Sequence, residues 1–262
     1  MKETEREGFP RIELWLSAAM MGAFFVLWEW LVWAGIIPAL FFPAPSTILL
    51  TLFHLVGDGE LAVHTGATLS RVALGLALGG IPGTLLGFMM GWSRRLRSVI
   101  DPWVAAVHPI PKIAILPLIM IVFGIGETSK VVVIAISAFF PMLINTMAGV
   151  RQISPIHFEV AQNYGASPTK IISRVVIPGS LPMVLVGARL ALNTTLLITI
   201  AVELVAAQNG LGAMIWLAWQ TLRVEQIYSS LFVVALLGIL FNGLLQRLGR
   251  RLVPWETLQE PE

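Results

Sequence analysis

The residues that most often perform chemistry in proteins are sparse in this chain of 262 residues. It has no cysteine, which excludes disulfides and thiolate metal sites. Its four histidines never occur in the H-E-x-x-H spacing of a zinc protease, and the glycine-containing stretch 124–130 lacks the spacing of a phosphate-binding loop. We therefore predict no catalytic site, no metal site and no nucleotide hydrolysis by this chain itself.

Charged residues inside apolar segments are the next candidates, because a charge in a membrane is costly unless it has a partner. Arg71 and Glu203 lie at similar depth in two apolar segments and have opposite charges. We expect Arg71 to form a structural ion pair with Glu203 or with Glu29, in preference to a role in substrate binding. For Glu29, which lies between two tryptophans, the alternative is that it reaches the outer headgroups.

A second group of basic residues surrounds the proline-rich apolar segment 102–123. Lys112 lies within it, His108 precedes Lys112 by about one turn, and Arg189 enters another segment from the same side. Such a cluster would favour an anion in a transport pathway, whereas the alternative is that Lys112 extends to the interface and Arg189 serves packing. The polar residues that could line the pathway or bond helix to helix are Asn145, Asn193, Thr194, Thr195 and Asn242.

The elements that must position these residues are membrane helices. Hydrophobic residues make up 56% of the chain and charged residues 12%, about half the charged share of a soluble domain. A membrane helix needs about 20 apolar residues. The segments that satisfy this length are 14–37, 64–92, 102–123, 130–150, 181–206 and 228–248. The second is rich in glycine, which lets another helix approach closely, and the prolines of the third make it a candidate pathway wall.

The distribution of lysine and arginine predicts the orientation of these helices. The residues expected on one side are Lys2, Arg6, Arg11, Arg94, Arg95, Arg97, Arg151, Lys170, Arg174, Arg247, Arg250 and Arg251. Lys130 and Arg223 fall on the other side. Because the cytoplasmic side carries the excess of positive charge, we predict that both termini are cytoplasmic and that loops 38–63, 124–129 and 207–227 face outward.

One cytoplasmic connection, residues 154–170, is long and polar enough to hold structure of its own. Its Ser-Pro start and its Gly165 predict a helix, a sharp turn and a second helix. Gly165 suits the turn because it has no Cβ.

This connection resembles the EAA loop of ABC importer permeases. The matching residues are Glu159-Val160-Ala161, Gly165-Ala166, Val175-Val176-Ile177-Pro178 and Pro182. Val160 departs from the middle alanine of that pattern. Fragments elsewhere resemble the nitrate, sulfonate, taurine and bicarbonate branch of these permeases. They are Leu69–Val72, Phe123–Gly126 with Ser129-Lys130, Phe139–Pro141, Asn145-Thr146, Gly187–Arg189, Glu203-Leu204 and Gly210–Gly212.

The resemblance implies an all-α, six-helix type I importer fold that forms a homodimer in the bacterial inner membrane. It also implies two copies of a cytoplasmic ATPase that hold ATP and Mg, a periplasmic or lipid-anchored binding protein, and no nucleic acid partner. The residues it implies for coupling to the ATPase are Glu159, Val160, Ala161, Tyr164, Gly165, Ala166 and Ser167. On this reading Ala161 and Ala166 leave no bulk between the loop and the ATPase.

We expect three regions in the chain. They are 1–59 with the N-terminal tail, first helix and outer loop, 60–248 as the permease core with its coupling loop at about 151–180, and 249–262 as a cytoplasmic tail. The solute expected from the resemblance is a small anion such as nitrate, a sulfonate, taurine or bicarbonate, with neutral vitamin precursors also open. The alternative function is a secondary transporter or channel, although no internal repeat is visible and the acidic residues lie near helix ends.

Overall fold

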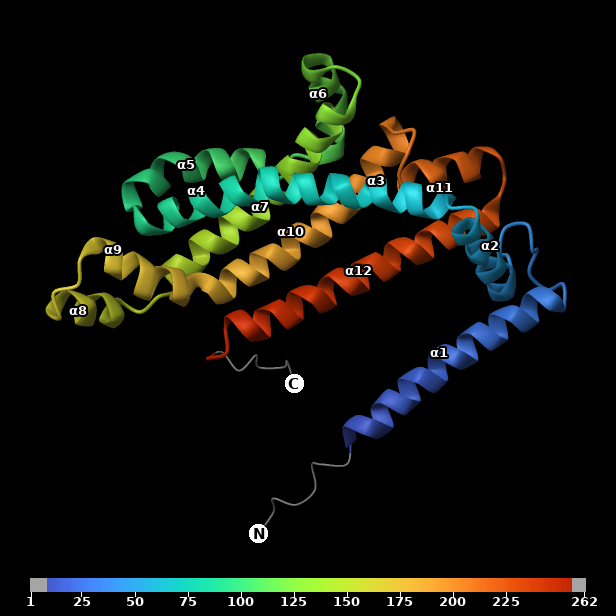
Figure 1. Cartoon of the computed structure of the whole chain (residues 1–262), viewed down its shortest axis with the longest axis horizontal. Helices are drawn as coiled ribbons and strands as arrows, with labels where there is room; N and C mark the ends of the chain where they lie inside the picture. Colours follow the sequence, from blue (N-terminus) through green and yellow to red (C-terminus); the bar gives the residue numbers. More distant parts are fainter. Residues whose placement is uncertain (1–8, 256–262) are drawn as a thin grey trace, which may run out of the picture.

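The computed structural model of the chain describes residues 9–255, with side chains from residue 15 onward, and these residues form helices without a strand (Figure 1). The all-α expectation is confirmed. The long helices are α1 Phe9–Trp33, α3 Glu60–Gly75 continued by the π-helical η1 Leu76–Gly80 and α4 Ile81–Trp92, α7 Glu127–Arg151, α10 Ile177–Ala206 and α12 Val224–Leu252. The shorter helices are α2 Pro45–Gly57, α5 Arg94–Val107, η2 Lys112–Ile115, α6 Leu116–Phe123, α8 Pro155–Asn163, α9 Pro168–Ile171, η3 Ile172–Val176 and α11 Leu211–Gln220.

Five of the six predicted membrane segments correspond to helices long and apolar enough to cross a bilayer. The segment predicted at 102–123 is different, because it divides into α5 and the pair η2–α6, which meet at 87°. Two prolines in the connection, Pro109 and Pro111, stop α5 because proline lacks a backbone donor and restricts the residue before it. The arginines predicted in the preceding loop lie in the first turn of α5.

Helices also occur where the sequence predicts only connections. The outer loop predicted at 38–63 contains α2, and the loop predicted at 207–227 contains α11. The segment predicted to begin at 181 continues backward through η3 to Pro168 as one helical stretch. Pro178 lies inside this stretch, directly after the π-helical η3, and proline is a common cause of such a departure from regular α-helix.

The core is built around α7, which packs between α4 on one side and α10 on the other. Glycines recur at every fourth position on the side of α3, η1 and α4 that faces α7: Gly75, Gly79, Gly83, Gly87 and Gly91. A Cβ on Gly79 would lie 1.9 Å from the carbonyl oxygen of Ala135, and one on Gly83 would lie 2.5 Å from that of Phe139. The two backbones are therefore in contact, as the glycine content of the segment predicted.

Helix α1 lies apart from this core (Figure 1). It contacts α2, and its Trp28 packs against Tyr228 of α12 at a ring-centroid distance of 5.8 Å. The carboxylate of Glu29 accepts hydrogen bonds from the backbone nitrogen of Ser46 at 3.0 Å and from its hydroxyl at 2.7 Å. Glu29 therefore satisfies the first turn of α2 and does not pair with Arg71, whose carboxylate partners are Glu127 and Glu203. That Glu29 lies at the outer headgroups stays a prediction.

Candidate functional site

The polar connection folds as α8, a tight turn and α9, which confirms the predicted helix–turn–helix. Gly165 adopts a positive φ of 68°. Its amide donates to the carbonyl of Gln162 at 2.9 Å, and the amide of Ala166 donates to that of Ala161 at 3.0 Å. This pair of bonds is the Schellman arrangement that ends a helix, so Gly165 stands where an αL residue is required. Ser167 then caps α9, because its hydroxyl accepts from the amide of Lys170.

The small residues of this loop face the interior of the protein. Ala161 and Ala166 pack on a buried cluster made by the ends of α7, α9 and η3: Val150, Ile171 and Val176. Phe158 packs on the same cluster, and its ring lies 6.1 Å from that of Trp92 at the end of α4. The expectation that the two alanines face an external partner is therefore wrong, because their lack of bulk lets α8 lie on its own core.

The opposite face of α8 is exposed and partly apolar. Ile156, Val160 and Tyr164 follow one another at intervals of four residues and are 58%, 48% and 89% exposed. Glu159 is exposed on the same face. Three large apolar residues in a stripe on a helix are usually buried against the rest of the protein. An exposed stripe of this kind is typical of an interaction site.

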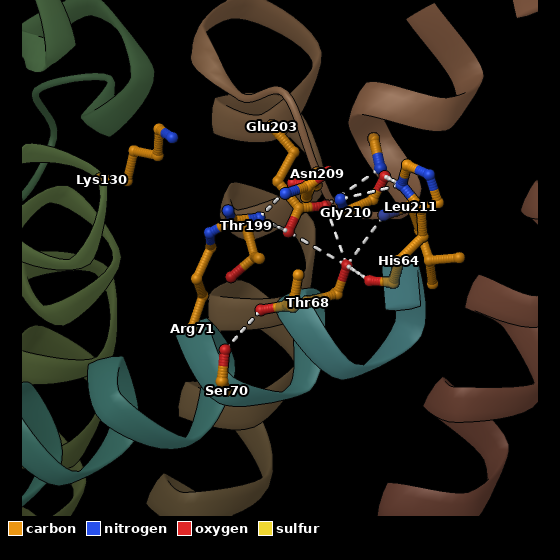
Figure 2. Close-up of polar contacts among 12 residues, drawn as sticks. His64, Thr68, Ser70, Arg71, Lys130, Thr199, Glu203, Asn209, Gly210 and Leu211 are labelled. Carbon is orange, nitrogen blue, oxygen red and sulfur yellow. Dashed lines mark hydrogen bonds and ion pairs between the residues drawn. The ribbon is translucent and has the colours of Figure 1, made fainter. Parts of the chain in front are cut away.

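At the other end of the molecule, Arg71 of α3 lies in a buried ionic network (Figure 2). Its Nη1 is 2.6 Å from Oε1 of Glu203, and its Nε is 2.7 Å from Oε2 of Glu127. Nη1 also donates to the carbonyl of Asn209 at 2.5 Å. Lys130, expected on the outer side at the start of segment 130–150, lies in the first turn of α7, is buried and pairs with Glu127 at 2.7 Å.

The carboxylate of Glu203, which has no exposed surface, also holds the start of α11. Its Oε2 accepts from the amide of Gly212 at 3.0 Å and from the hydroxyl of Thr68 at 2.9 Å. Thr68 in turn accepts from the amide of Leu211 at 2.9 Å. Figure 2 shows Thr68 and Arg71 pointing from α3 toward Glu203 and the start of α11. The carboxylate thus caps α11, which also suits the positive end of the helix dipole.

Two glycines allow this contact. Gly210 has a φ of 126°, and a Cβ there would lie 2.3 Å from the carboxyl carbon of Glu203. A Cβ on Gly212 would lie 2.4 Å from the carbonyl oxygen of Ile200. The ring of His64 completes the site, since its Nδ1 is 2.9 Å from the carbonyl oxygen of Gly210.

Of the basic cluster predicted for the pathway, Lys112 and His108 lie together on Phe140, whereas Arg189 lines a separate hollow. Lys112 donates to the carbonyl of His108 and lies over the ring of Phe140, 5.2 Å from its centroid. His108 packs against the same ring at 5.3 Å. Arg189 lines a separate hollow between α10 and α12, whose described lining includes neither Lys112 nor His108. The bend at 87° turns η2 toward α7, so Lys112 and His108 both contact Phe140 of α7, and a role for them in a pathway stays a prediction.

Other predicted pathway residues satisfy their own helices. Asn145 donates to the carbonyl of Pro141 at 2.8 Å, and the hydroxyl of Thr194 donates to that of Leu190 at 2.9 Å. Asn193 differs, because its side-chain oxygen accepts from Asn242 of α12 at 3.1 Å. That contact joins two helices beside the hollow of Arg189.

Comparison with known proteins relates this architecture to transport. Residues 83–257 match the family described as binding-protein-dependent transport system inner membrane component. This stretch includes α8, α9 and the Glu203 cap. The chain belongs to this family.

Two relatives extend the match over most of the chain. The taurine transport system permease protein TauC of Escherichia coli (strain K12) is 34% identical over 92% of this chain and 89% of its own length. A permease protein of Bacillus subtilis (strain 168), SsuC, named for aliphatic sulfonates transport, is 33% identical over 94% and 90%. In fold, a chain of the inward-facing MetNI methionine ABC transporter matches with a TM-score of 0.62 at 20% identity, over 71% of this chain and 92% of its own.

The chain is therefore a multi-pass transmembrane subunit of an ABC importer rather than an enzyme, and the alternative of a secondary transporter is not supported. A permease of this family works with a separate ATPase and a solute-binding protein. Sequence reasoning about the permease missed Glu127, Thr68 and His64. The spacing of Glu127 and Lys130, three residues apart, was the one available signal of an ion pair there.

Proposed function

We propose that this permease carries a small organic sulfonate or a related anion across the bacterial inner membrane as a homodimer, with both termini in the cytoplasm. The names of its relatives support the solute class, and the excess of lysine and arginine on one side supports the orientation. Two copies of the ATPase would bind ATP and Mg, and a periplasmic or lipid-anchored protein would deliver the solute.

The observation that carries the proposed coupling to a separate ATPase is the two-sided character of α8. One side, Phe158 and Ala161, packs on the permease core, and the other side, Ile156, Val160 and Tyr164, is exposed. A partner that pushes on the exposed side would therefore move a helix already joined to the core. An apolar helix face of this kind fits a groove on another protein.

The same contacts suggest how the movement spreads. Phe158 packs against Trp92 at the end of α4, and α4 is in backbone contact with α7 through the glycine stripe. Because packed backbones move as one body, we infer that α4 and α7 follow α8 together. Glu159 supplies a polar edge to the docking face, while Gly165, Ala166 and Ser167 fix its angle through the turn and the cap of α9.

The test compares Val160→Glu with Gln162→Glu, an equal change of charge at an exposed residue on the flank of α8. We expect Val160→Glu to weaken ATPase binding by about 2 kcal/mol or more, as at a central interface residue. Gly165→Asp should act similarly because φ at residue 165 is 68°. The readouts are permease abundance in membranes, ATPase that co-purifies, and uptake of radiolabelled taurine by the complete transporter.

Equal ATPase recovery from Val160→Glu and Gln162→Glu would refute the docking face. Uptake by the purified permease alone, driven by an ion gradient, would refute the dependence on ATP. Uptake of a neutral heterocycle but no anion would refute the solute class while leaving the docking face intact.

A further inference from the structure

A hollow of about 620 Å³ lies between α10 and α12 and has a partly polar lining. Its polar members are Arg189 of α10 and Asn242 and Gln246 of α12. The rest of the lining is Ala235, Gly238, Ile239 and Gly243. The volume falls in the range of about 300–1,000 Å³ that is typical of small-molecule sites.

Arg189 lies near the middle of α10, is exposed, and has no ion-pair partner among residues 15–255. The described lining of the hollow contains no acidic residue. A guanidinium at membrane depth is costly without a counter-charge, so it marks a site that something else must complete. One close contact of α10 with α7 is made by Gly187, where a Cβ would lie 2.9 Å from that of Asn145, and it involves no charge.

A hydrogen bond between the two side-chain amides holds Asn242 and Asn193 in place. Asn242 donates to the side-chain oxygen of Asn193 at 3.1 Å and to the carbonyl of Gly238 at 2.9 Å. These bonds use both N–H groups of Asn242, so Gln246 is the amide donor of the lining that stays available beside Arg189. A guanidinium fork with an amide donor matches the paired oxygens of a sulfonate, carboxylate or phosphate.

Space for such a group comes from Gly243. A Cβ built on Gly243 meets no atom within 4 Å, and one on Gly238 first meets Leu196 at 3.9 Å. These glycines therefore do not serve close helix packing, unlike the stripe that faces α7. A larger side chain at residue 243 would enter the hollow without displacing a neighbour.

We propose that the hollow lined by Arg189, Asn242 and Gln246 binds an oxyanion group within the membrane. Two sources share this chemistry: the sulfonate end of the transported solute and the phosphate of an anionic lipid headgroup. The first source rests on the proposed function, whereas the second does not.

The test measures how fast phenylglyoxal, an arginine reagent, modifies Arg189 in the complete transporter, with peptides read by mass spectrometry. Nanodiscs of phosphatidylcholine, with and without methanesulfonate, test the soluble anion, and nanodiscs of phosphatidylglycerol test the headgroup. At ten times the dissociation constant, a bound anion should slow modification of Arg189 about tenfold by mass action. Arg223, which is exposed outside the hollow, is the internal control and should not change.

Gly243→Leu should remove the protection of Arg189 by filling the hollow. Gly22→Leu is its matched control, because a Cβ on Gly22 of α1 also meets nothing within 4 Å. Protection by methanesulfonate assigns the site to the solute, and protection by phosphatidylglycerol alone assigns it to lipid. No protection by either anion, or equal protection in Gly243→Leu and wild type, would overturn the site.

These outcomes separate the site from the proposed function. A transporter that takes up taurine while Arg189 stays unprotected keeps its function and loses the site. A transporter that takes up no anion while Arg189 is protected by phosphatidylglycerol loses the proposed solute class and keeps the site.

Discussion

Two arginines in the long helices of this permease have opposite surroundings. Arg71 is 4% exposed and contacts Glu203, Glu127 and the carbonyl of Asn209. Arg189 is exposed to a hollow and has no carboxylate partner within residues 15–255. Both are guanidinium groups on membrane helices, so their chemistry is the same and only their neighbours differ.

The difference separates a structural charge from an available one. The protein provides every counter-charge that Arg71 needs, and the network joins α3, α7, α10 and the start of α11. A ligand could contact Arg71 only by displacing those partners. Arg189 offers its hydrogen bonds to whatever enters the hollow. If this comparison is correct, substitutions at the two sites should divide between effects on stability and effects on binding.

The largest effect on stability is expected for Arg71→Gln. The change leaves the fully buried carboxylate of Glu203 without its cation, and breaking a buried pair in this way costs about 3–5 kcal/mol. We expect a loss of about 10 °C in the apparent melting temperature of the purified permease, measured in one detergent throughout. The double variant Arg71→Gln/Glu203→Gln should recover part of the loss, because no unpaired charge remains. An unchanged melting temperature in Arg71→Gln would contradict the structural role.

A smaller effect is expected for Gly210→Ala. The new Cβ would lie 2.3 Å from the carboxyl carbon of Glu203, and φ there is 126°. Backbone strain of this kind costs about 1–3 kcal/mol, and displacement of the carboxylate adds to it. The control is Gly124→Ala, where φ is 82° but no atom lies within 4 Å of the new Cβ. Thermal unfolding should show a greater loss for Gly210→Ala, and equal losses would mean that the carboxylate contact adds nothing.

Several of these features could be predicted from the sequence because their signals are local or strongly constrained. The Ser-Pro start and Gly165 predict the helix–turn–helix of α8 and α9, since only a residue that tolerates positive φ suits the turn. The glycine-rich segment predicts close packing on another helix. The pairing of Arg71 with Glu203, 132 residues apart, could also be predicted. A charge inside a membrane needs a partner of opposite charge at a similar depth, and few residues of this chain meet that condition.

Other features depend on which way a side chain or a helix faces, and residue type alone does not show this. Ala161 and Ala166 are small whether they face a partner or their own core, so their orientation could not be read from residue type. Lys112 lies beyond the bend of 87°, where its amine is over Phe140 of α7 and donates to the carbonyl of His108 at the end of α5, and residue order alone does not show these contacts. The capping of α11 by Glu203 could not be predicted, because α11 lies in the stretch 207–227 that the sequence predicts as a loop.

The smallest effect on stability is expected for Arg189→Gln, the matched substitution at the second arginine. No ion pair within residues 15–255 is lost. The free energy of unfolding should therefore stay within about 0.5 kcal/mol of wild type, and the melting temperature should barely change. The measurement uses the same detergent as for Arg71→Gln, because the comparison depends on the difference between the two variants. A loss at Arg189 as large as that at Arg71 would mean that a carboxylate of another subunit completes the hollow. In that case the charge would be structural at both sites, and the distinction between the two arginines would fail.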